Sequence, residues 1–203
     1  MKKIALLVLL VFCGNVYSQK KKTKPKETPT TVIAKGSNYS AELFKNKFYL
    51  VLKIAATKDT LFLKTYSDKV TPIDCKITAF STKGTPLYLV TWTEKQTTET
   101  KLKKEENVFT ESQIWNPATK NLVLGNTQTV SNIKEIVFLD KLKTASETQE
   151  KIRRSGLEFV FLGEDYSLSD KYSSLKYSYN ATSMKYEIAK TSVATKAQKK
   201  TKR

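Results

Sequence analysis

Carboxylates are the residues of this sequence best suited to catalysis, because the chain has no histidine. Without histidine it lacks the most frequent general base and the most frequent zinc ligand. The candidates are two adjacent pairs and one isolated residue: Glu105 and Glu106, Glu164 and Asp165, and Glu158. Two carboxyl groups that cleave a glycosidic bond must face each other across the substrate, whereas adjacent strand residues point to opposite faces. We therefore expect surface carboxylates, and a pair assembled from distant positions stays open.

A second pattern with chemical meaning is the spacing of Ser173 and Lys176. It is similar to the Ser-x-x-Lys motif of penicillin-binding proteins and related hydrolases, in which the lysine activates the serine. That motif opens a helix, whereas this stretch leads into a predicted strand, and no Ser-Asp-Asn or Lys-Thr-Gly partner follows. No loop has the acidic spacing of a calcium site. We therefore predict no catalytic residue, no metal site and no cofactor.

Tyrosines gather near the C-terminal end, between positions 166 and 186. Tyr177 and Tyr179 share one face of a predicted strand, and Tyr186 is expected opposite them across a hairpin. A flat aromatic row suits stacking on sugar rings or on a protein partner, because tyrosine combines apolar area with a hydroxyl. The same pattern is typical of a cross-strand ladder that only stabilises an edge hairpin. These three tyrosines are nevertheless the candidate binding residues of the hairpin.

The net charge of +17 lies mostly in two lysine-rich ends. Each lysine or arginine near an anionic surface contributes about 1 kcal/mol of attraction. Such ends could tether the chain to lipid head groups or lipopolysaccharide, or simply keep it soluble. The candidate binding residues in the ends are Lys20, Lys21, Lys22, Lys199 and Lys200.

The first eighteen residues have the composition of an export signal. Lys2 and Lys3 precede the apolar run 4–12, which is too short to span a bilayer as a helix. Cleavage after Ser18 would leave Cys75 as the single thiol, whereas lipidation at Cys13 is the alternative. We expect an exported protein in the periplasm, at the outer-membrane surface or outside the cell, without a transmembrane helix in the mature chain.

One helix is expected, at about residues 144–155. Thr144 and Glu147 have the spacing of a capping box. Arg153 and Arg154 would lie in the last turn, where cations suit the helix dipole, and Gly156 would end the helix. In this interpretation, two apolar runs that flank the helix, 133–139 and 157–162, form strands, and the first of them makes a hairpin with the run 122–130 over Ser131 and Asn132.

Short apolar runs separated by turns, among them residues 87–93, predict about nine strands in the whole chain. The polar stretch 94–107 is expected to be a long exposed hairpin arm or a loop. The fold class is therefore mainly β, an antiparallel sandwich or a partly closed barrel with one helix. The predicted organisation is a signal peptide (1–18), a disordered lysine- and proline-rich linker (19–37), one β-rich domain (38–190) and a basic disordered tail (191–203).

These features favour an exported, non-enzymatic protein of the cell envelope that binds an anionic surface or a protein partner. A small hydrolase that acts on envelope glycans through carboxylates is the first alternative, and a small outer-membrane β-barrel is the second. A nucleic-acid binder is expected only if the export signal is misread, because exported basic ends do not meet nucleic acid.

Overall fold

The part of the chain that the structure describes is built from strands. The computed structural model describes residues 30–54, 57–67 and 70–189, which contain thirteen strands and no helix. The prediction of a mainly β fold is confirmed, with more strands than the nine expected. Nothing in these residues forms a helix long and apolar enough to cross a membrane.

The strands form three antiparallel sheets in which each strand pairs with its neighbour along the chain. The N-terminal sheet consists of β1 (Thr31–Lys35), β2 (Tyr39–Phe44), β3 (Lys47–Ile54) and β4 (Thr57–Thr65). The central sheet consists of β5 (Ile73–Thr82), β6 (Thr85–Glu99), β7 (Lys103–Asn116), β8 (Asn121–Phe138) and β9 (Ser146–Ser155). The C-terminal sheet consists of β10 (Glu158–Leu162), β11 (Asp165–Ser169), β12 (Ser174–Asn180) and β13 (Lys185–Ile188).

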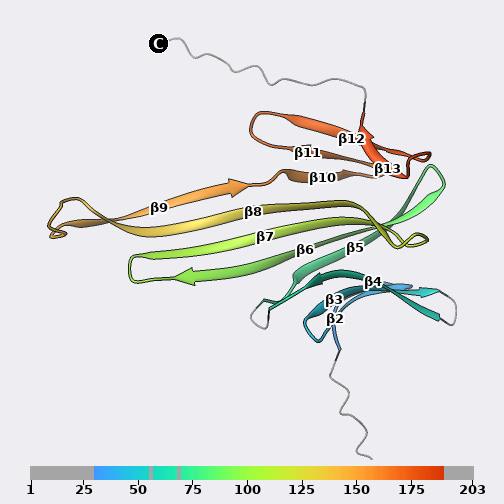
Figure 1. Cartoon of the computed structure of the whole chain (residues 1–203), viewed down its shortest axis with the longest axis horizontal. Coiled ribbons are helices and arrows are strands. Elements are labelled where there is room, and N and C mark those ends of the chain that lie inside the picture. Colours follow the sequence, from blue (N-terminus) through green and yellow to red (C-terminus); the bar gives the residue numbers. More distant parts are fainter. Residues whose placement is uncertain (1–29, 55–56, 68–69, 190–203) are drawn as a thin grey trace, which may run out of the picture.

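The two smaller sheets pack at one end of the long central sheet (Figure 1). Strand β6 contacts both smaller sheets, because its successive side chains point to opposite faces of the central sheet. Val90 and Trp92 are buried against the N-terminal sheet, whereas Leu87 and Leu89 are buried against the C-terminal sheet. Of the two architectures that the sequence left open, the structure has the sandwich.

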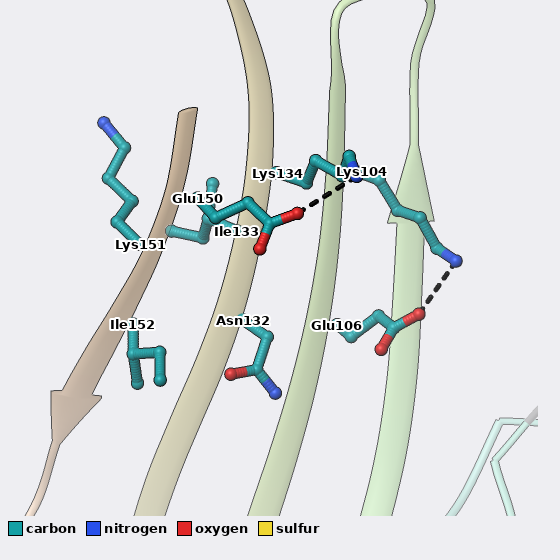
Figure 2. Close-up of a pocket in the computed structure, with 8 residues that line it drawn as sticks. All are labelled: Lys104, Glu106, Asn132, Ile133, Lys134, Glu150, Lys151 and Ile152. Carbon is teal, nitrogen blue, oxygen red and sulfur yellow. Dashed lines mark ion pairs between the residues drawn. The ribbon is translucent and has the colours of Figure 1, made fainter. Parts of the chain in front are cut away.

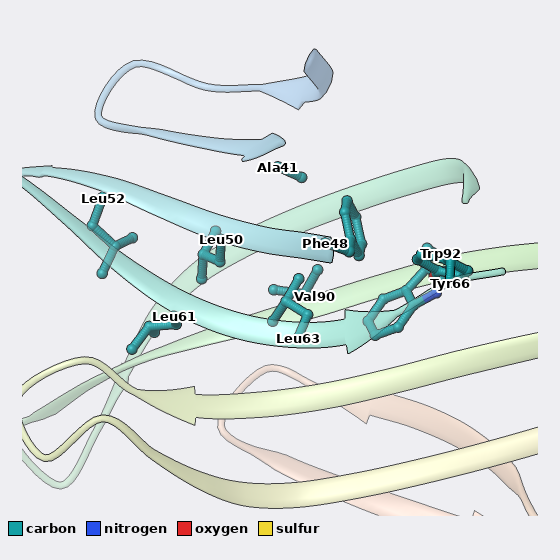
Figure 3. Close-up of a cluster of buried hydrophobic side chains, with 9 residues drawn as sticks. All are labelled: Ala41, Phe48, Leu50, Leu52, Leu61, Leu63, Tyr66, Val90 and Trp92. Carbon is teal, nitrogen blue, oxygen red and sulfur yellow. The ribbon is translucent and has the colours of Figure 1, made fainter. Parts of the chain in front are cut away.

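The first core lies between the N-terminal sheet and the central sheet (Figure 3). Phe48 meets the ring of Trp92 edge-on, with 5.3 Å between the ring centroids. Burying one leucine or phenylalanine side chain contributes about 1.5–3 kcal/mol, so this cluster holds the two sheets together. Its other buried members are Ala41, Leu50, Leu52, Leu61, Leu63, Tyr66 and Val90.

The second core lies between the central sheet and the C-terminal sheet. Leu87, Leu89 and Ile114 from the central sheet meet Tyr166 and Tyr179 there. Aromatic side chains are prominent in this core, because both tyrosines are buried and further rings pack around them. The C-terminal sheet is thus held by tyrosine packing.

The predicted helix at residues 144–155 is wrong, because β9 occupies most of this range as a strand. Apart from alanine, Ile152 is the one aliphatic residue in this range, so a helix here would have no apolar stripe to bury. Pairing with β8 instead gives every residue of β9 a ladder partner. Thr144 bonds to Asp140 in the preceding turn and does not cap a helix.

The predicted hairpin over Ser131 and Asn132 is also wrong. Strand β8 runs without interruption through both residues, which pair with Asn107 and Glu106 of β7. Serine and asparagine often mark turns. Here the long partner strands on both sides satisfy their backbone groups and keep β8 extended.

The domain begins earlier than the predicted boundary at residue 38. Strand β1 starts at Thr31 and pairs with β2, so the predicted linker 19–37 extends too far. The run Thr31-Val32-Ile33 is β-branched, which favours a strand.

The turn from β2 into β3 is tight. Lys45 and Asn46 form it, and both have positive φ.

Candidate functional site: an uncovered arm and its tip

The central sheet extends beyond both smaller sheets as an arm, defined here as residues 95–107 and 131–153 (Figure 1). It contains the distal parts of β6, β7 and β8 and most of β9. Of the two alternatives predicted for residues 94–107, the long hairpin is confirmed, because β6 and β7 pair along this stretch up to Glu99 and Lys104, although its first residue, Glu94, is buried. The arm holds itself together by strand pairing and by side chains on its own surface.

One face of the arm carries linked ion pairs. Glu105 lies 2.8 Å from Arg153 Nη2 and 2.6 Å from Lys103 Nζ. The hydrogen bond from Lys103 lowers the pKa of the Glu105 carboxyl, as does the nearby Arg153 charge. Lys151 pairs with Glu135 on the same face. Ile133 lies between Glu105 and Lys151 in the ladder and is only 7% exposed, so long charged side chains shield it.

The opposite face carries an open groove of about 450 Å³ across β7, β8 and β9 (Figure 2). Two ion pairs border it, Lys104 with Glu106 at 2.8 Å and Lys134 with Glu150 at 3.0 Å. Ile152 supplies an apolar surface on the edge strand β9, beside Asn132, and is 64% exposed.

The tip of the arm consists of two loops, residues 100–102 and 139–145. The backbone N–H of Ile136 in β8 donates a 2.8 Å hydrogen bond to the Leu102 carbonyl, so the first loop lies beside the end of β8, and the second loop extends beyond it at the same end of the sheet (Figure 1). Three leucines project from them: Leu102 is 46% exposed, Leu139 63% and Leu142 84%. Leucines this exposed at the end of a sheet do not contribute to the protein's own core.

Lysines surround the tip leucines. Lys101, Lys141 and Lys143 are exposed in the same two loops. Asp140 is the acidic residue there, and its carboxylate accepts hydrogen bonds from the backbone N–H and the hydroxyl of Thr144. The hydroxyl bond is the main reason why the pKa of Asp140 is lowered. The tip therefore combines exposed leucines, lysines and a carboxylate engaged in shaping the turn.

A buried charged cluster lies at the base of the arm, under the end of β4. Lys64 Nζ lies 2.8 Å from Glu94 Oε1 and 2.7 Å from Glu111 Oε1. Glu94 also accepts 2.8 Å hydrogen bonds from the Tyr66 hydroxyl and from the Trp92 indole N–H, and Thr127 donates to Glu111 at 2.7 Å. The two glutamates are 5% and 8% exposed.

The electrostatics of this cluster are those of a structural site. Burial tends to lower the pKa of Lys64, but the hydrogen bonds to Glu111 and Glu94 outweigh it and the pKa is raised. Burial and Glu94 raise the pKa of the Tyr66 hydroxyl. Because each carboxylate has several donors, neither is free to act as an acid or base. Sequence reasoning missed the cluster, although Glu94 follows Val90 and Trp92 at inward-facing positions.

The predicted tyrosine row exists, but its rings pack inside the molecule. Tyr179 faces Tyr186 in the β12–β13 ladder, and Tyr177 stacks on Tyr166 with 4.9 Å between ring centroids. Tyr179 is 1% exposed and the Tyr186 hydroxyl donates to the Glu164 carbonyl. These rings belong to the second core or pack against it, so they do not form an open platform.

The remaining predicted residues fall into three groups. Lys20, Lys21, Lys22, Lys199 and Lys200 lie outside the described residues. Asp165 pairs with Lys176 at 2.9 Å, so this lysine serves an ion pair and does not activate Ser173. Burial raises the pKa of the Cys75 thiol to about 12, as expected for an inert side chain packed against the first core. Within the described residues, no group of three or more Cys, Asp or Glu side chains could hold a metal ion.

A second groove lies where the arm emerges from under the C-terminal sheet. Arg154 and Ile152 of β9 form one side of it, and Asp170, Lys171 and Tyr172 of the β11–β12 turn form the other. Tyr172, which lies between positions 166 and 186 where the tyrosines gather, is exposed to solvent.

Comparison with known proteins assigns no family: no protein-family model, no curated protein and no solved structure matches the chain. Its function must therefore be inferred from its own geometry.

Proposed function

We propose that this chain is an exported, non-enzymatic protein of the cell envelope that binds an anionic surface of lipid head groups or lipopolysaccharide. The observation that supports the proposal is the tip of the arm, where three exposed leucines lie among exposed lysines. Leucines suit insertion just below the head groups, and lysines suit contact with the phosphates above them.

The energies of such a contact are sufficient for reversible binding. Each lysine near an anionic surface contributes about 1 kcal/mol, and full burial of one leucine contributes about 1.5–3 kcal/mol. Leu139 and Leu142, together with Lys101, Lys141 and Lys143, are placed to contribute both kinds of attraction. The lysine-rich ends of the chain would add electrostatic attraction that salt weakens.

A binding role also agrees with the state of the carboxylates. Glu94 and Glu111 are held by Lys64 and by further donors. Glu105 and Glu106 lie on opposite faces of β7 and each has its own lysine partner. A glycosidase needs two carboxyl groups that face one substrate, and these four glutamates are not so arranged.

Vesicle co-sedimentation of the full chain tests the proposal. We expect binding to vesicles that contain phosphatidylglycerol, little binding to phosphatidylcholine alone, and release by salt. Leu139→Ser combined with Leu142→Ser should weaken binding about tenfold or more, since partial burial of two leucines is lost. Vesicles that carry lipopolysaccharide in place of phosphatidylglycerol distinguish the two anionic sources.

The matched control is Leu122→Ser, because Leu122 is also exposed but lies at the opposite end of β8. It should leave vesicle binding unchanged. Deleting residues 191–203 measures the share of the C-terminal tail. If the tip variant binds as tightly as the unchanged chain, the arm does not contact the membrane and the proposal fails.

A further inference from the structure

Strand β9 is an edge strand with an open side. It is the last strand of the central sheet, it pairs with β8 alone among the described residues, and all ten of its residues are exposed. We propose that a second copy of the chain pairs antiparallel with β9, so that two central sheets join into one continuous sheet. This inference rests on β9 and is independent of membrane binding by the tip.

The ladder fixes which backbone groups of β9 face outward. The N–H of Leu139 donates a 3.0 Å hydrogen bond to the Ala145 carbonyl. In the β8–β9 ladder, the hydrogen-bonded pairs are therefore formed by odd-numbered residues of both strands, whose backbone groups point toward each other. The bond from Ile136 N–H to the Leu102 carbonyl agrees, since it directs even-numbered residues of β8 toward β7. Directions alternate along a strand. The outward groups of β9 are therefore those of Ser146, Thr148, Glu150, Ile152 and Arg154.

This edge lacks the structural features that usually prevent strands from pairing. Short edge strands, prolines and β-bulges are the common means. Strand β9 is ten residues long, has no proline and keeps a regular register with β8. At the opposite edge of the same sheet, β5 is preceded by Pro72 and has a register shift between Ile73 and Lys76. The two edges of the central sheet are thus unequal, and β9 is the one suited to pairing.

Charges, which otherwise protect an edge, are here self-complementary. In an antiparallel pair, directly opposed residues must both direct their backbone groups toward the partner or both away from it. A two-fold axis at Gln149 satisfies this condition and places Glu147 opposite Lys151 of the second copy, twice. Those positions are not hydrogen-bonded, so their side chains come closest. Thr148 then faces Glu150 of the second copy in hydrogen-bonded positions.

The neighbouring registers are less favourable. Moving the axis to Glu150 places the two Glu150 carboxylates opposite each other, and moving it to Lys151 opposes the two lysines. Like charges directly opposite each other destabilise a strand pair. An axis at Thr148 opposes no like charges but also brings no opposite charges together. The register centred on Gln149 is therefore the favoured one of these four, with about eight backbone hydrogen bonds along the new ladder.

Charge exchange gives the first test, measured by sedimentation velocity with the full chain. The unchanged chain should form dimers. Glu147→Lys and Lys151→Glu should each prevent self-association, because each opposes like charges at both sites. Mixing the two variants should restore a dimer that contains one of each. A monomeric unchanged chain at hundreds of micromolar, or a mixture that stays monomeric, would overturn the proposal.

Two controls separate pairing from folding. Glu106→Lys reverses an exposed charge on the interior strand β7 and should leave the dimer intact. Thr148→Pro removes an outward N–H without removing a bond to β8, so the chain should keep its circular dichroism spectrum and become monomeric. Persistent dimers of the folded Thr148→Pro variant would exclude pairing through β9.

Disulfide trapping tests the register. In a Cys13→Ser, Cys75→Ser background, Gln149→Cys should form a covalent dimer on mild oxidation, because the axis brings both copies of this residue within disulfide range. Glu147→Cys alone should cross-link poorly, but should cross-link efficiently when mixed with Lys151→Cys. If Glu147→Cys alone cross-links as readily as Gln149→Cys, the proposed register is wrong.

Discussion

The indole N–H of Trp92 donates a 2.8 Å hydrogen bond to Oε1 of Glu94, two positions further along the same face of β6. Trp92 belongs to the first core, whereas Glu94 binds the lysine that closes the end of that core. The bond therefore joins the apolar packing to the buried charged cluster at the point where the covered part of the sheet becomes the arm. The cluster seals the end of the first core.

Removing Glu94 should destabilise the protein strongly. In the Glu94→Ala variant, the Tyr66 hydroxyl and the Trp92 indole lose their acceptor and Lys64 loses one of its two partners. Breaking a buried ion pair costs about 3–5 kcal/mol, and we expect about 3 kcal/mol because Lys64 is partly exposed. Urea unfolding measures the loss. Glu106→Ala, which breaks an exposed pair, should cost less than about 1 kcal/mol, and equal losses would contradict a sealing role.

Stability should decline at alkaline pH. Burial raises the pKa of Cys75 from 9.0 to about 12, and the pKa values of Tyr66 and Lys64 are also raised. A raised pKa means that the folded state holds its proton longer than the unfolded state. The stabilisation is therefore complete below the unfolded pKa and is lost as pH rises toward the folded pKa.

The loss should begin near pH 9 with Cys75, with a slope of at most about 1.4 kcal/mol per pH unit for one proton. Urea unfolding between pH 8 and pH 12 measures it. In Cys75→Ala the decline should begin only near pH 10, where unfolded tyrosine and lysine ionise. An unchanged onset in this variant would show that the thiol is accessible in the folded protein.

Removing either of two tyrosine hydroxyls of the C-terminal sheet should change the stability of the protein, in opposite directions. The Tyr179 hydroxyl is buried without a hydrogen-bond partner among the described residues, whereas the Tyr186 hydroxyl donates to the Glu164 carbonyl at 2.8 Å. Tyr179→Phe should stabilise the protein by about 1 kcal/mol, and Tyr186→Phe should destabilise it by about 1 kcal/mol. Thermal unfolding of the two variants checks the sign, and a loss in Tyr179→Phe would reveal a partner for its hydroxyl.

Gly156, which connects β9 to β10, should tolerate no side chain. Its φ is +78°, and a Cβ atom would lie 2.2 Å from the Thr127 carbonyl oxygen. Gly156→Ala should cost about 3 kcal/mol, since a left-handed residue costs about 1–2 kcal/mol and the clash adds a backbone shift. Gly163→Ala is the control, because Gly163 has a φ of +91° but open space around it. Gly163→Ala should cost only about 1–2 kcal/mol for the left-handed conformation, without a clash.

The sequence was sufficient where apolar patterning is dense. Residues 87–93 predicted a strand, and β6 is indeed buried on both faces there. The sequence pattern gave a wrong prediction at β9, where a capping-box pattern and a following glycine indicate a helix although no apolar stripe supports one. In that segment the partner strand decides the structure. A local pattern cannot report that β8 continues for eighteen residues and offers a ladder.

The candidate site was harder to anticipate than the fold. The polar composition of residues 94–107 predicts an exposed hairpin as one of two alternatives, but it does not indicate that loop 139–145 lies at the same end of the sheet. Only the pairing of β7 with β8 brings Leu102 beside Ile136 and so to the end of the sheet from which loop 139–145 projects. Conversely, the tyrosine row was visible in the sequence, and only the packing of two sheets shows that Tyr179 is buried. Both differences arise from contacts between segments distant in sequence.

The uninterrupted sequential pairing of the strands bears on how the chain acquires its structure. All-β proteins often fold slowly, because strands remote in sequence must find each other before their contacts gain any free energy. Here each hairpin contains only neighbouring segments, and the N-terminal sheet is complete before β5 begins. Folding can therefore advance from one hairpin to the next, without waiting for strands remote in sequence to meet.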